Sequence, residues 1–231
     1  MLNKINVKPK LITFDICSAL VDIYNGLIPI ISDITGLSSQ NSHIFLKNWR
    51  YKQLQTTYLS NSLNIGRFSF YKCTEMSLDY VCKINKLRIK AADKKTLISY
   101  WNKLPLWPEA FNVISSIISR GYKIAILSNG DQEMLEKLSK SFGFKFDYIF
   151  SSESNGFYKP HSSIYELPKI QLGINKSDIL HVAGSDVDVI GTVSYGMECL
   201  WSNRKGEILI DKKFKPKYES QNLSVLEKIL L

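Results

Sequence analysis

Short runs of mostly apolar residues recur along the chain and predict buried strands. These runs cover residues 11–14, 122–128, 146–152, 179–185 and 199–203. From about residue 105 onward, the segments between runs carry apolar residues at every third or fourth position, which predicts helices. The second half of the chain therefore alternates between strand and helix.

The predicted helices of this half are marked by glycine and proline. Gly121, Gly143 and Gly196 each follow a helical pattern, where a left-handed residue commonly ends a helix. Pro168 lies inside one segment and predicts a kink or a break. The helical patterns cover residues 111–118, 135–142, 162–172, 187–195 and 223–230.

Residues 24–103 contain no strand-like run. Their apolar residues recur with helical spacing, as at Leu54 and Tyr58, and Gly36 and Gly66 mark plausible breaks. We therefore expect an all-helical insertion after the first strand. The expected domains are an α/β core, residues 1–23 and 104–231, and a helical domain, residues 24–103.

Strands that alternate with helices at this spacing predict an α/β fold built on a doubly wound parallel sheet. Such sheets bind ligands beyond the carboxyl ends of their strands. Lys159 lies in the loop that follows residues 146–152. The residues at the strand ends themselves are nearly all polar: Asp15, Ser128, Asn129, Ser152, Ser185, Asp186 and Asp188. One edge of the sheet is therefore the candidate site.

Charge and composition narrow the class of partner. The 231 residues include 30 Lys and Arg against 21 Asp and Glu, a formal net charge of +9. The excess is spread along the chain with no nucleic-acid motif, so we expect attraction of a small anion and no nucleic-acid partner. No apolar run reaches the roughly 18 residues of a membrane span, and the opening ten residues lack a signal-peptide core. We expect a cytoplasmic protein without a membrane partner.

The sequence contains four cysteines that are far apart along the chain. None forms a C-x-x-C motif or has a histidine at metal-ligand spacing. Structural zinc and a disulfide framework are therefore not expected. The cysteines are Cys17, Cys73, Cys82 and Cys199.

The order of the strand-end motifs resembles the haloacid dehalogenase (HAD) superfamily of hydrolases, and within it the type II L-2-haloacid dehalogenases. The similar stretches are TFDICSALVD, NWRYKQLQTTYL, IAILSNG, FYKPHSSIYEL and HVAGSDVD. The resemblance extends over residues 11–202. It implies a Rossmann-like core in which residues 24–103 form a cap.

The resemblance also implies roles for the charged residues. Asp15 would be the nucleophile that attacks C2 of a 2-haloalkanoic acid, expels halide and becomes an ester, which water then hydrolyses. Lys159 would keep Asp15 ionised. Asp188 would hold Lys159 and orient the water, and Arg50 would receive the halide. On the residues alone, a solvated helix arginine is the favoured interpretation of Arg50.

The implied substrate-binding residues are Ser128, Asn129, Arg50, Ser185, Tyr165, Leu54 and Phe70. Trp49 is a further candidate for the apolar wall, although all the apolar positions also fit a helix core. The implied partner is a small anionic 2-haloacid, with no metal ion and no cofactor. A homodimer is the expectation by resemblance.

The segment after Asp15 departs from the family pattern. Phosphatases of the superfamily usually carry a second Asp at the position of Cys17, and dehalogenases usually carry Tyr there. A thiol is a poor proton donor to a leaving alkoxide, whereas a halide needs no proton. Ser18 and Ala19 replace the usual Gly-Thr, so a hydroxyl near the nucleophile is lost.

The segment 183–188 departs as well. It reads AGSDVD where dehalogenases usually read SSNAWD. Ala183 loses a hydroxyl, and Ser185, which replaces Asn, can still bond Lys159. Gly184 stands where phosphatases usually place an acidic Mg²⁺ ligand, so a hard cation would lack oxygen ligands here.

Three functions follow from these observations. The first is a metal-independent dehalogenase that works through an aspartyl ester. The second is a non-catalytic or altered-substrate relative, favoured by the changes at Cys17, Ala19, Ala183 and Ser185. The third is a Mg²⁺-dependent phosphatase of the same fold, which needs metal ligands that the sequence does not supply.

Overall fold

A computed structural model describes residue 5 and residues 8–63 and 65–230. Most of the opening stretch on which the signal-peptide expectation rests lies outside these residues. The central element is a six-stranded sheet in the order β3-β2-β1-β4-β5-β6, in which every pair of neighbours is parallel. The strands are β1 (Leu11–Phe14), β2 (Ile124–Ser128), β3 (Tyr148–Ser151), β4 (Ile179–Ala183), β5 (Glu198–Ser202) and β6 (Tyr218–Ser220).

The predicted doubly wound parallel sheet is confirmed, and each predicted strand has a counterpart in the structure. The apolar runs predicted five strands, and β6 adds a sixth at the edge of the sheet. Leu200 pairs with Tyr218, whose side chain is buried. β6 was missed because three residues beside a lysine-rich run carry no apolar periodicity.

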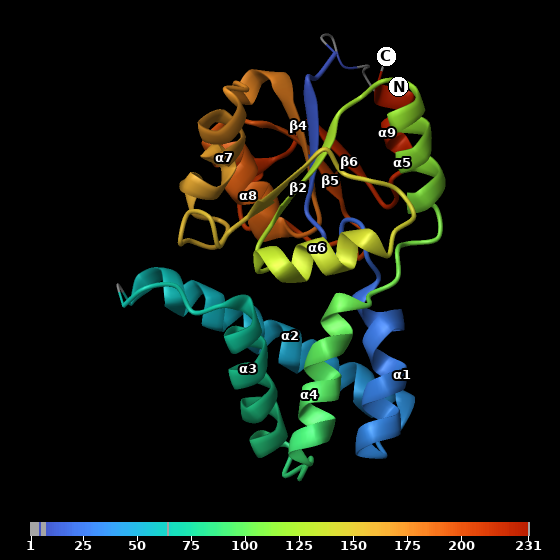
Figure 1. Ribbon diagram of the computed structural model, residues 1–231, viewed down its shortest axis with the longest axis vertical. Helices are drawn as coiled ribbons and strands as arrows, with labels where there is room; N and C mark the ends of the chain where they lie inside the picture. Colours follow the sequence, from blue (N-terminus) through green and yellow to red (C-terminus); the bar gives the residue numbers. More distant parts are fainter. Residues whose placement is uncertain (1–4, 6–7, 64, 231) are drawn as a thin grey trace.

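Helices cover both faces of the sheet (Figure 1). On one face lie α5 (Ala110–Ser119), α6 (Gln132–Lys140) and α9 (Val225–Ile229), and on the other lie α7 (Ser162–Leu172) and α8 (Asp186–Tyr195). The break considered at Pro168 does not occur, since α7 continues through this buried proline. Packing of the apolar face of α7 outweighs the lost backbone hydrogen bond. Short 3-10 turns are η1 (Tyr100–Asn102), η2 (Lys176–Asp178) and η3 (Lys212–Phe214).

Four further helices pack together beyond the carboxyl ends of the strands (Figure 1). We call them the helical unit; they are α1 (Ile23–Thr35), α2 (Ser39–Ser62), α3 (Phe70–Ile84) and α4 (Ala91–Ser99). The side chains of Asp22, Ser38 and Ser69 cap the first three at their N-termini. Gly36 ends α1 in the left-handed conformation, with φ at 70°.

The two connections between sheet and helical unit run side by side. Val21 and Leu106 form an antiparallel bridge, and the Asp22 N–H donates to the Pro105 carbonyl at 2.8 Å. The chain therefore leaves the sheet and returns to it at one point, as an inserted segment must.

A second contact between the two parts is centred on Asp131, in the loop before α6. Its carboxylate accepts the backbone N–H groups of Phe70 and Tyr71, at 2.8 and 2.9 Å, and an Arg67 N–H at 2.8 Å. Arg67 also lies over the Tyr158 ring, with its guanidinium carbon 4.4 Å from the ring centroid. A carboxylate of the sheet unit therefore caps the first turn of α3 in the helical unit.

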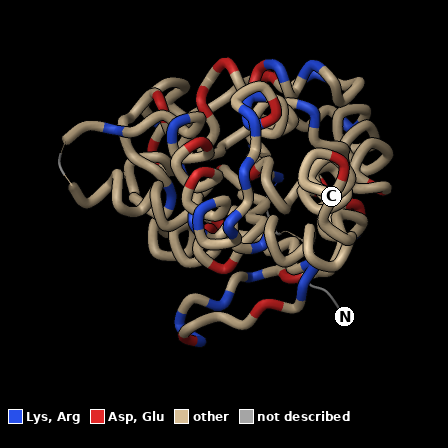
Figure 2. Tube along the Cα trace, turned by 90° about the horizontal axis from the view of Figure 1, so that it is seen from below, with Lys and Arg blue, Asp and Glu red and all other residues tan. Residues whose placement is uncertain are grey.

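Charged side chains are distributed over the whole fold. Figure 2 shows Lys and Arg interspersed with Asp and Glu along the trace. Within the described residues, no helix combines the length and the apolar character that a bilayer crossing requires.

Replacing Asp131 by Ala is expected to loosen the helical unit. Two backbone donors and Arg67 would lose a charged acceptor, so the free energy of unfolding should fall by about 2 kcal/mol in a urea titration. Amide hydrogen exchange at Phe70 and Tyr71 should accelerate.

Ser69→Ala is the matched control, since Ser69 caps the same helix from within the helical unit. It should cost about 1 kcal/mol and leave the contact with Asp131 in place. An unchanged exchange rate at Phe70 in Asp131→Ala would contradict the assigned contact.

Candidate active site

A pocket lies between the helical unit and the carboxyl ends of β1 and β4. Strand order reverses between these two strands, which is where doubly wound sheets bind ligands. The empty space, including its open mouth, is about 400 Å³. Its lining residues come from both parts of the chain: Asp15, Cys17, Arg50, Leu54, Tyr58, Phe70, Ser128, Asn129, Gly130, Lys159, Ser185, Val187 and Asp188.

Asp15 stands at the end of β1, where its backbone N–H donates to the Val182 carbonyl of β4 at 3.0 Å. The Ser128 hydroxyl donates to its Oδ1 at 2.8 Å, and the Lys159 ammonium lies 3.5 Å from the same oxygen. No hydrogen bond to Oδ2 is found among the described residues. One carboxylate oxygen is thus held by the protein, and the other is left to a ligand.

Lys159 connects Asp15 to a second buried carboxylate. Its ammonium donates to Asp188 Oδ2 at 2.8 Å, and only 4% of the Lys159 surface is exposed. Asp188 also accepts the Tyr165 hydroxyl at Oδ1, at 2.8 Å, and contacts the His181 imidazole at 3.0 Å. Several donors thus fix Asp188 in place.

The two carboxyls differ in acidity because their partners differ. Burial is the main influence on Asp15 and raises its pKa; Lys159 opposes this shift, and the Asp188 charge adds to it. Burial would also raise the pKa of Asp188, but the ammonium of Lys159 and the His181 ring outweigh it and hold that pKa below its usual value. Asp188 is therefore a fixed anion, and Asp15 is the carboxyl whose charge depends on Lys159.

One face of α2 supplies the opposite wall of the pocket. Arg50, Leu54 and Tyr58 follow each other at four-residue spacing and all line it. Arg50 donates to the Gln53 side chain at 2.5 Å, and its guanidinium carbon lies 5.5 Å from the centre of the Trp101 ring. These contacts hold the arginine at the pocket.

The loops after β2 and β4 supply the polar edge. Asn129 Oδ1 accepts the Lys159 backbone N–H at 2.7 Å, which turns the Asn129 amide nitrogen away from that contact. Ser185 lines the pocket and accepts the Asp188 N–H at 3.3 Å as the N-cap of α8. The predicted bond from Ser185 to Lys159 is absent from the described contacts, because the hydroxyl is used as this cap.

Two residues predicted near the substrate are not among those that line the pocket. Tyr165 is buried behind Asp188 and reaches the site only through its bond to that carboxylate. Trp49 is buried inside the helical unit, where it donates to the Thr74 carbonyl at 3.0 Å and packs edge-on against Trp101. Leu54 and Phe70 do line the pocket.

The loop after Asp15, which departs from the family pattern, packs against Gly184, a second departure at the end of β4. Ser18 adopts a φ of 72°, a left-handed conformation that costs a non-glycine residue about 1 kcal/mol. The same loop closes on Gly184, where an added Cβ would lie 2.4 Å from the Ala19 nitrogen and 2.6 Å from the Cys17 carbonyl oxygen. A serine at 184 would therefore not fit this loop.

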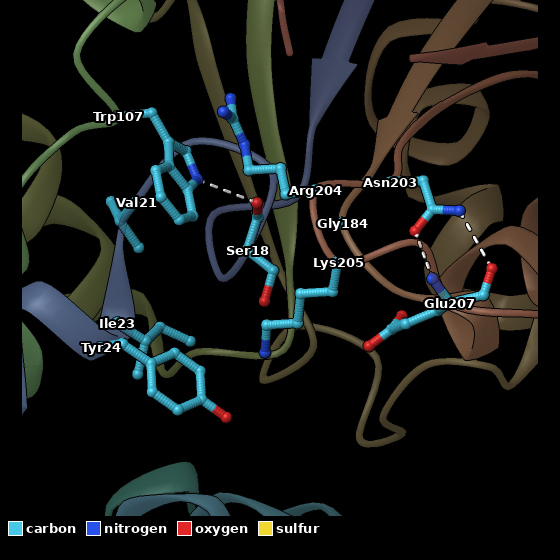
Figure 3. Close-up of a pocket in the computed structure, with 10 residues that line it drawn as sticks. All are labelled: Ser18, Val21, Ile23, Tyr24, Trp107, Gly184, Asn203, Arg204, Lys205 and Glu207. Atoms are coloured by element: carbon cyan, nitrogen blue, oxygen red, sulfur yellow. Dashed lines mark hydrogen bonds between the residues drawn. The ribbon is translucent and has the colours of Figure 1, made fainter. Parts of the chain in front are cut away.

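A second pocket borders the same loop (Figure 3). It lies between Ser18, Tyr24 and Trp107 and the segment after β5. Its cations already have partners: Arg204 pairs with Glu109 at 2.6 Å, and Lys205 lies 4.3 Å from the centre of the Tyr24 ring. Its lining does not include Asp15 or Lys159, so we place the chemistry in the first pocket.

Sequence reasoning missed His181 and Tyr58 as site residues. His181 is fully buried under the Lys159–Asp188 pair, and its signal was a lone polar residue within an apolar strand. The helical spacing predicts Tyr58 only as an apolar helix position, and its signal is a spacing from Arg50 that puts both residues on one helix face. Burial is the main cause that raises the pKa of Tyr58, to about 12, so its hydroxyl stays protonated.

No group of three or more His, Cys, Asp or Glu side chains arranged to hold a metal ion occurs within the described residues. The four cysteines are free and buried. Burial raises the pKa of Cys17 to about 11, so the thiol beside Asp15 stays protonated at neutral pH.

The fold and the site together define an α/β protein in which a buried carboxylate–lysine pair faces a small pocket. A sequence profile of the haloacid dehalogenase-like hydrolases matches residues 9–192. The chain belongs to this family of hydrolases.

Similar proteins support this assignment over most of the chain. The (S)-2-haloacid dehalogenase of Pseudomonas sp. (strain YL) is 28% identical over 214 residues, covering 92% of this chain and 90% of that protein. Haloacetate dehalogenase H-2 of Moraxella sp. (strain B) is 29% identical over 202 residues, covering 86% and 88%.

Solved structures share the fold. The L-2-haloacid dehalogenase of Xanthobacter autotrophicus, determined with chloropropionic acid covalently bound, superposes with a TM-score of 0.83 at 21% identity and covers 95% of this chain and 97% of that one. A dehalogenase crystallised as an intermediate complex reaches 0.89 at 24% identity, covering 98% and 99%.

Lys159→Met is expected to raise the pKa of Asp15. Burial already raises it, and Lys159 is the largest opposing influence. As pH falls, Asp15 should therefore gain its proton at a higher pH in the variant than in the wild type. Carbon-13 NMR of the Asp15 carboxyl across a pH titration measures this shift.

Lys145→Met is the control, because Lys145 is an exposed lysine outside the pocket. It should leave the Asp15 titration unchanged. A lower or equal Asp15 pKa in Lys159→Met would contradict the electrostatic role of Lys159.

Proposed function

We propose that this chain is a metal-independent 2-haloacid dehalogenase that converts a small 2-haloalkanoic acid to a 2-hydroxy acid and halide. The observation that carries the proposal is Asp15: Ser128 and Lys159 hold its Oδ1, no hydrogen bond to its Oδ2 occurs among the described residues, and the residue lines a pocket to which Arg50 also contributes. A carboxylate held in this way is oriented for attack on carbon.

In the first step, Asp15 Oδ2 attacks C2 of the substrate. The new C–O bond forms as the carbon–halogen bond breaks, and the halogen leaves with the bonding electron pair as halide. Lys159 keeps Asp15 ionised before the attack. The Arg50 guanidinium stabilises the charge that grows on the departing halogen.

In the second step, water attacks the carbonyl carbon of the Asp15 ester. Oδ1 then becomes the oxyanion, and it already accepts the Ser128 hydroxyl at 2.8 Å with the Lys159 ammonium at 3.5 Å. Collapse of this intermediate breaks the ester C–O bond and restores Asp15. The hydroxy acid takes a proton from the attacking water.

The surroundings of Cys17 favour halide over phosphate-ester chemistry. An alkoxide leaving group needs a proton, and a thiol with a pKa of about 11 is a weak acid for that purpose. A halide leaves without a proton. The curated relatives are also named as dehalogenases of 2-haloacids or haloacetate, which supports this substrate class for the present chain.

Binding of the substrate carboxylate is assigned to the edge of the pocket after β2. Asn129 and Gly130 line it, and the amide nitrogen of Asn129 is turned away from Lys159, whereas the Ser128 hydroxyl at the same edge donates to Asp15. Donors of this kind suit a carboxylate. The formal net charge of +9 would assist capture of the anion.

We further propose that residues 1–23 and 104–231 form the core domain and residues 24–103 the cap. The adjacent connections at Val21 and Leu106 support these boundaries. The cap would contribute Arg50, Leu54 and Tyr58, and the core would contribute the nucleophile.

A homodimer through the cap is part of the proposal. Large apolar side chains are exposed along α2 and α3, and a second copy of the chain is the occupant proposed for that face. They include Tyr51, Leu59, Tyr71, Met76, Tyr80 and Ile84. Light scattering should give twice the 26.5 kDa chain mass, and Tyr80→Asp with Met76→Asp should reduce it to that of one chain.

A cytoplasmic location is proposed from cysteine chemistry. All four cysteines are free, which suits a reducing compartment. Recovery of the protein in an extracellular or periplasmic fraction would contradict this assignment.

Asp15→Asn is expected to abolish halide release from L-2-chloropropionate, by at least about a thousandfold, because an amide cannot act as the anionic nucleophile. The wild type should release halide at the same rate with and without EDTA. Ion chromatography of chloride measures both rates.

Asp33→Asn is a matched control, because Asp33 lies on α1 outside the pocket. Absence of halide release by the wild type would exclude the dehalogenase proposal. Release that depends on added Mg²⁺ would exclude the metal-independent mechanism.

Tyr58→Phe tests the tyrosine that lines the pocket beside Cys17. No hydrogen bond to its hydroxyl occurs within the described chain, and Arg50 lies close enough to influence its pKa. We expect the protonated hydroxyl to donate to bound substrate or halide, so kcat/KM should fall about tenfold. Tyr51→Phe, an exposed tyrosine on the same helix, should have no effect, and an equal effect of both changes would contradict the role of Tyr58.

A further inference from the structure

A buried polar pair crosses the centre of the sheet directly beneath the active site. Thr13 of β1 is in register with His181 of β4, and both residues are completely buried. The Thr13 hydroxyl lies 2.8 Å from His181 Nδ1. Since an unpaired imidazole in this setting would be costly, the contacts of both ring nitrogens matter.

The other ring nitrogen faces the charged cluster. His181 Nε2 lies 3.0 Å from Asp188 Oδ2 and 3.3 Å from the Lys159 ammonium. An ionised carboxylate only accepts and an ammonium only donates. Because the carboxylate is the nearer of the two, at 3.0 Å against 3.3 Å, we assign the proton to Nε2, pointing to Asp188. Nδ1 then accepts the Thr13 hydroxyl.

This arrangement requires a neutral ring. Burial is the main cause that lowers the pKa of His181, although the Asp188 charge raises it. The imidazole therefore contributes two directional hydrogen bonds without adding another full charge to the cluster.

His181 occupies the strand face from which a hydroxyl is missing. The resemblance described above implies serine at position 183, where this chain has Ala183. Residues two apart on a strand share a face, so His181 and Ala183 point to the same side of β4.

We propose that His181 is a positioning residue that replaces the missing hydroxyl: it holds Asp188 and thereby fixes Lys159 between the two carboxylates. This role rests on the proposed dehalogenase function. This positioning role depends on three residues of this chain. Thr13 and His181 form the buried pair, and Ala183 lacks the hydroxyl.

The first test is His181→Phe, which keeps an aromatic ring of similar size and removes both nitrogens. With L-2-chloropropionate, kcat for chloride release should fall about tenfold or more while KM stays within about twofold, because His181 does not line the pocket. His43→Phe, a change at an exposed histidine on α2, should leave both constants unchanged. Circular dichroism establishes that each variant is folded.

The second test is the double variant His181→Phe, Ala183→Ser. A serine hydroxyl at 183 should recover most of the lost kcat, whereas a purely structural role for His181 predicts no recovery. A folded double variant that is no faster than His181→Phe would overturn the proposal, as would a folded His181→Phe with wild-type kcat.

A third measurement does not depend on turnover. Nitrogen-15 NMR of the free wild-type protein at pH 7 should show a neutral His181 with its proton on Nε2. An imidazolium, or a proton on Nδ1, would overturn the proposed contact even in an active enzyme. If the NMR result is as expected but the wild type releases no chloride, the dehalogenase function fails and the catalytic role of His181 fails with it.

Discussion

The position of the Lys159 ammonium between two buried carboxylates is the constraint on which the site depends. A charge removed from water is tolerated only when its partners are close and well oriented. Here they are 2.8 and 3.5 Å away, and each comes from a different part of the sheet. Asp15 directly follows β1 and Asp188 lies in the first turn of α8 after β4, so the order of the strands is what brings the two anions to one cation. The unequal distances leave Asp188 firmly paired and Asp15 more reactive.

The altered positions around this cluster form one connected set. Ser18 adopts a left-handed backbone, and the loop that contains it leaves no room for a side chain at Gly184. Cys17 leaves the pocket without the tyrosine expected from the family, while Tyr58 brings a protonated phenol to the same pocket from α2. The phenol of Tyr58 in the pocket that lacks the family's tyrosine favours an altered site over a lost one.

Much of the fold and part of the site could be predicted from the sequence. Apolar runs that end in polar residues located five strands, and the rule that ligands bind at their carboxyl ends selected Asp15, Ser128 and Asp188 without any structure. β6 carries too little periodicity to be recognised. His181 was missed because only the register with Thr13 shows that its ring reaches Asp188. That Tyr165 lies behind Asp188 and Trp49 inside the helical unit could not be predicted, because a sequence shows that an aromatic residue is buried but not which neighbour it faces.

The spacing of the pocket residues on α2 has a consequence for how the substrate range of such a protein changes. Arg50, Leu54 and Tyr58 project from successive turns of one rigid rod. A slight roll or slide of that rod moves a charge, an apolar surface and a hydroxyl together. Substitutions at the contact of α2 with α1, where Ser32 bonds Ser42, would shift the position of α2. They would therefore change the shape and polarity of the pocket without altering the nucleophile or its lysine.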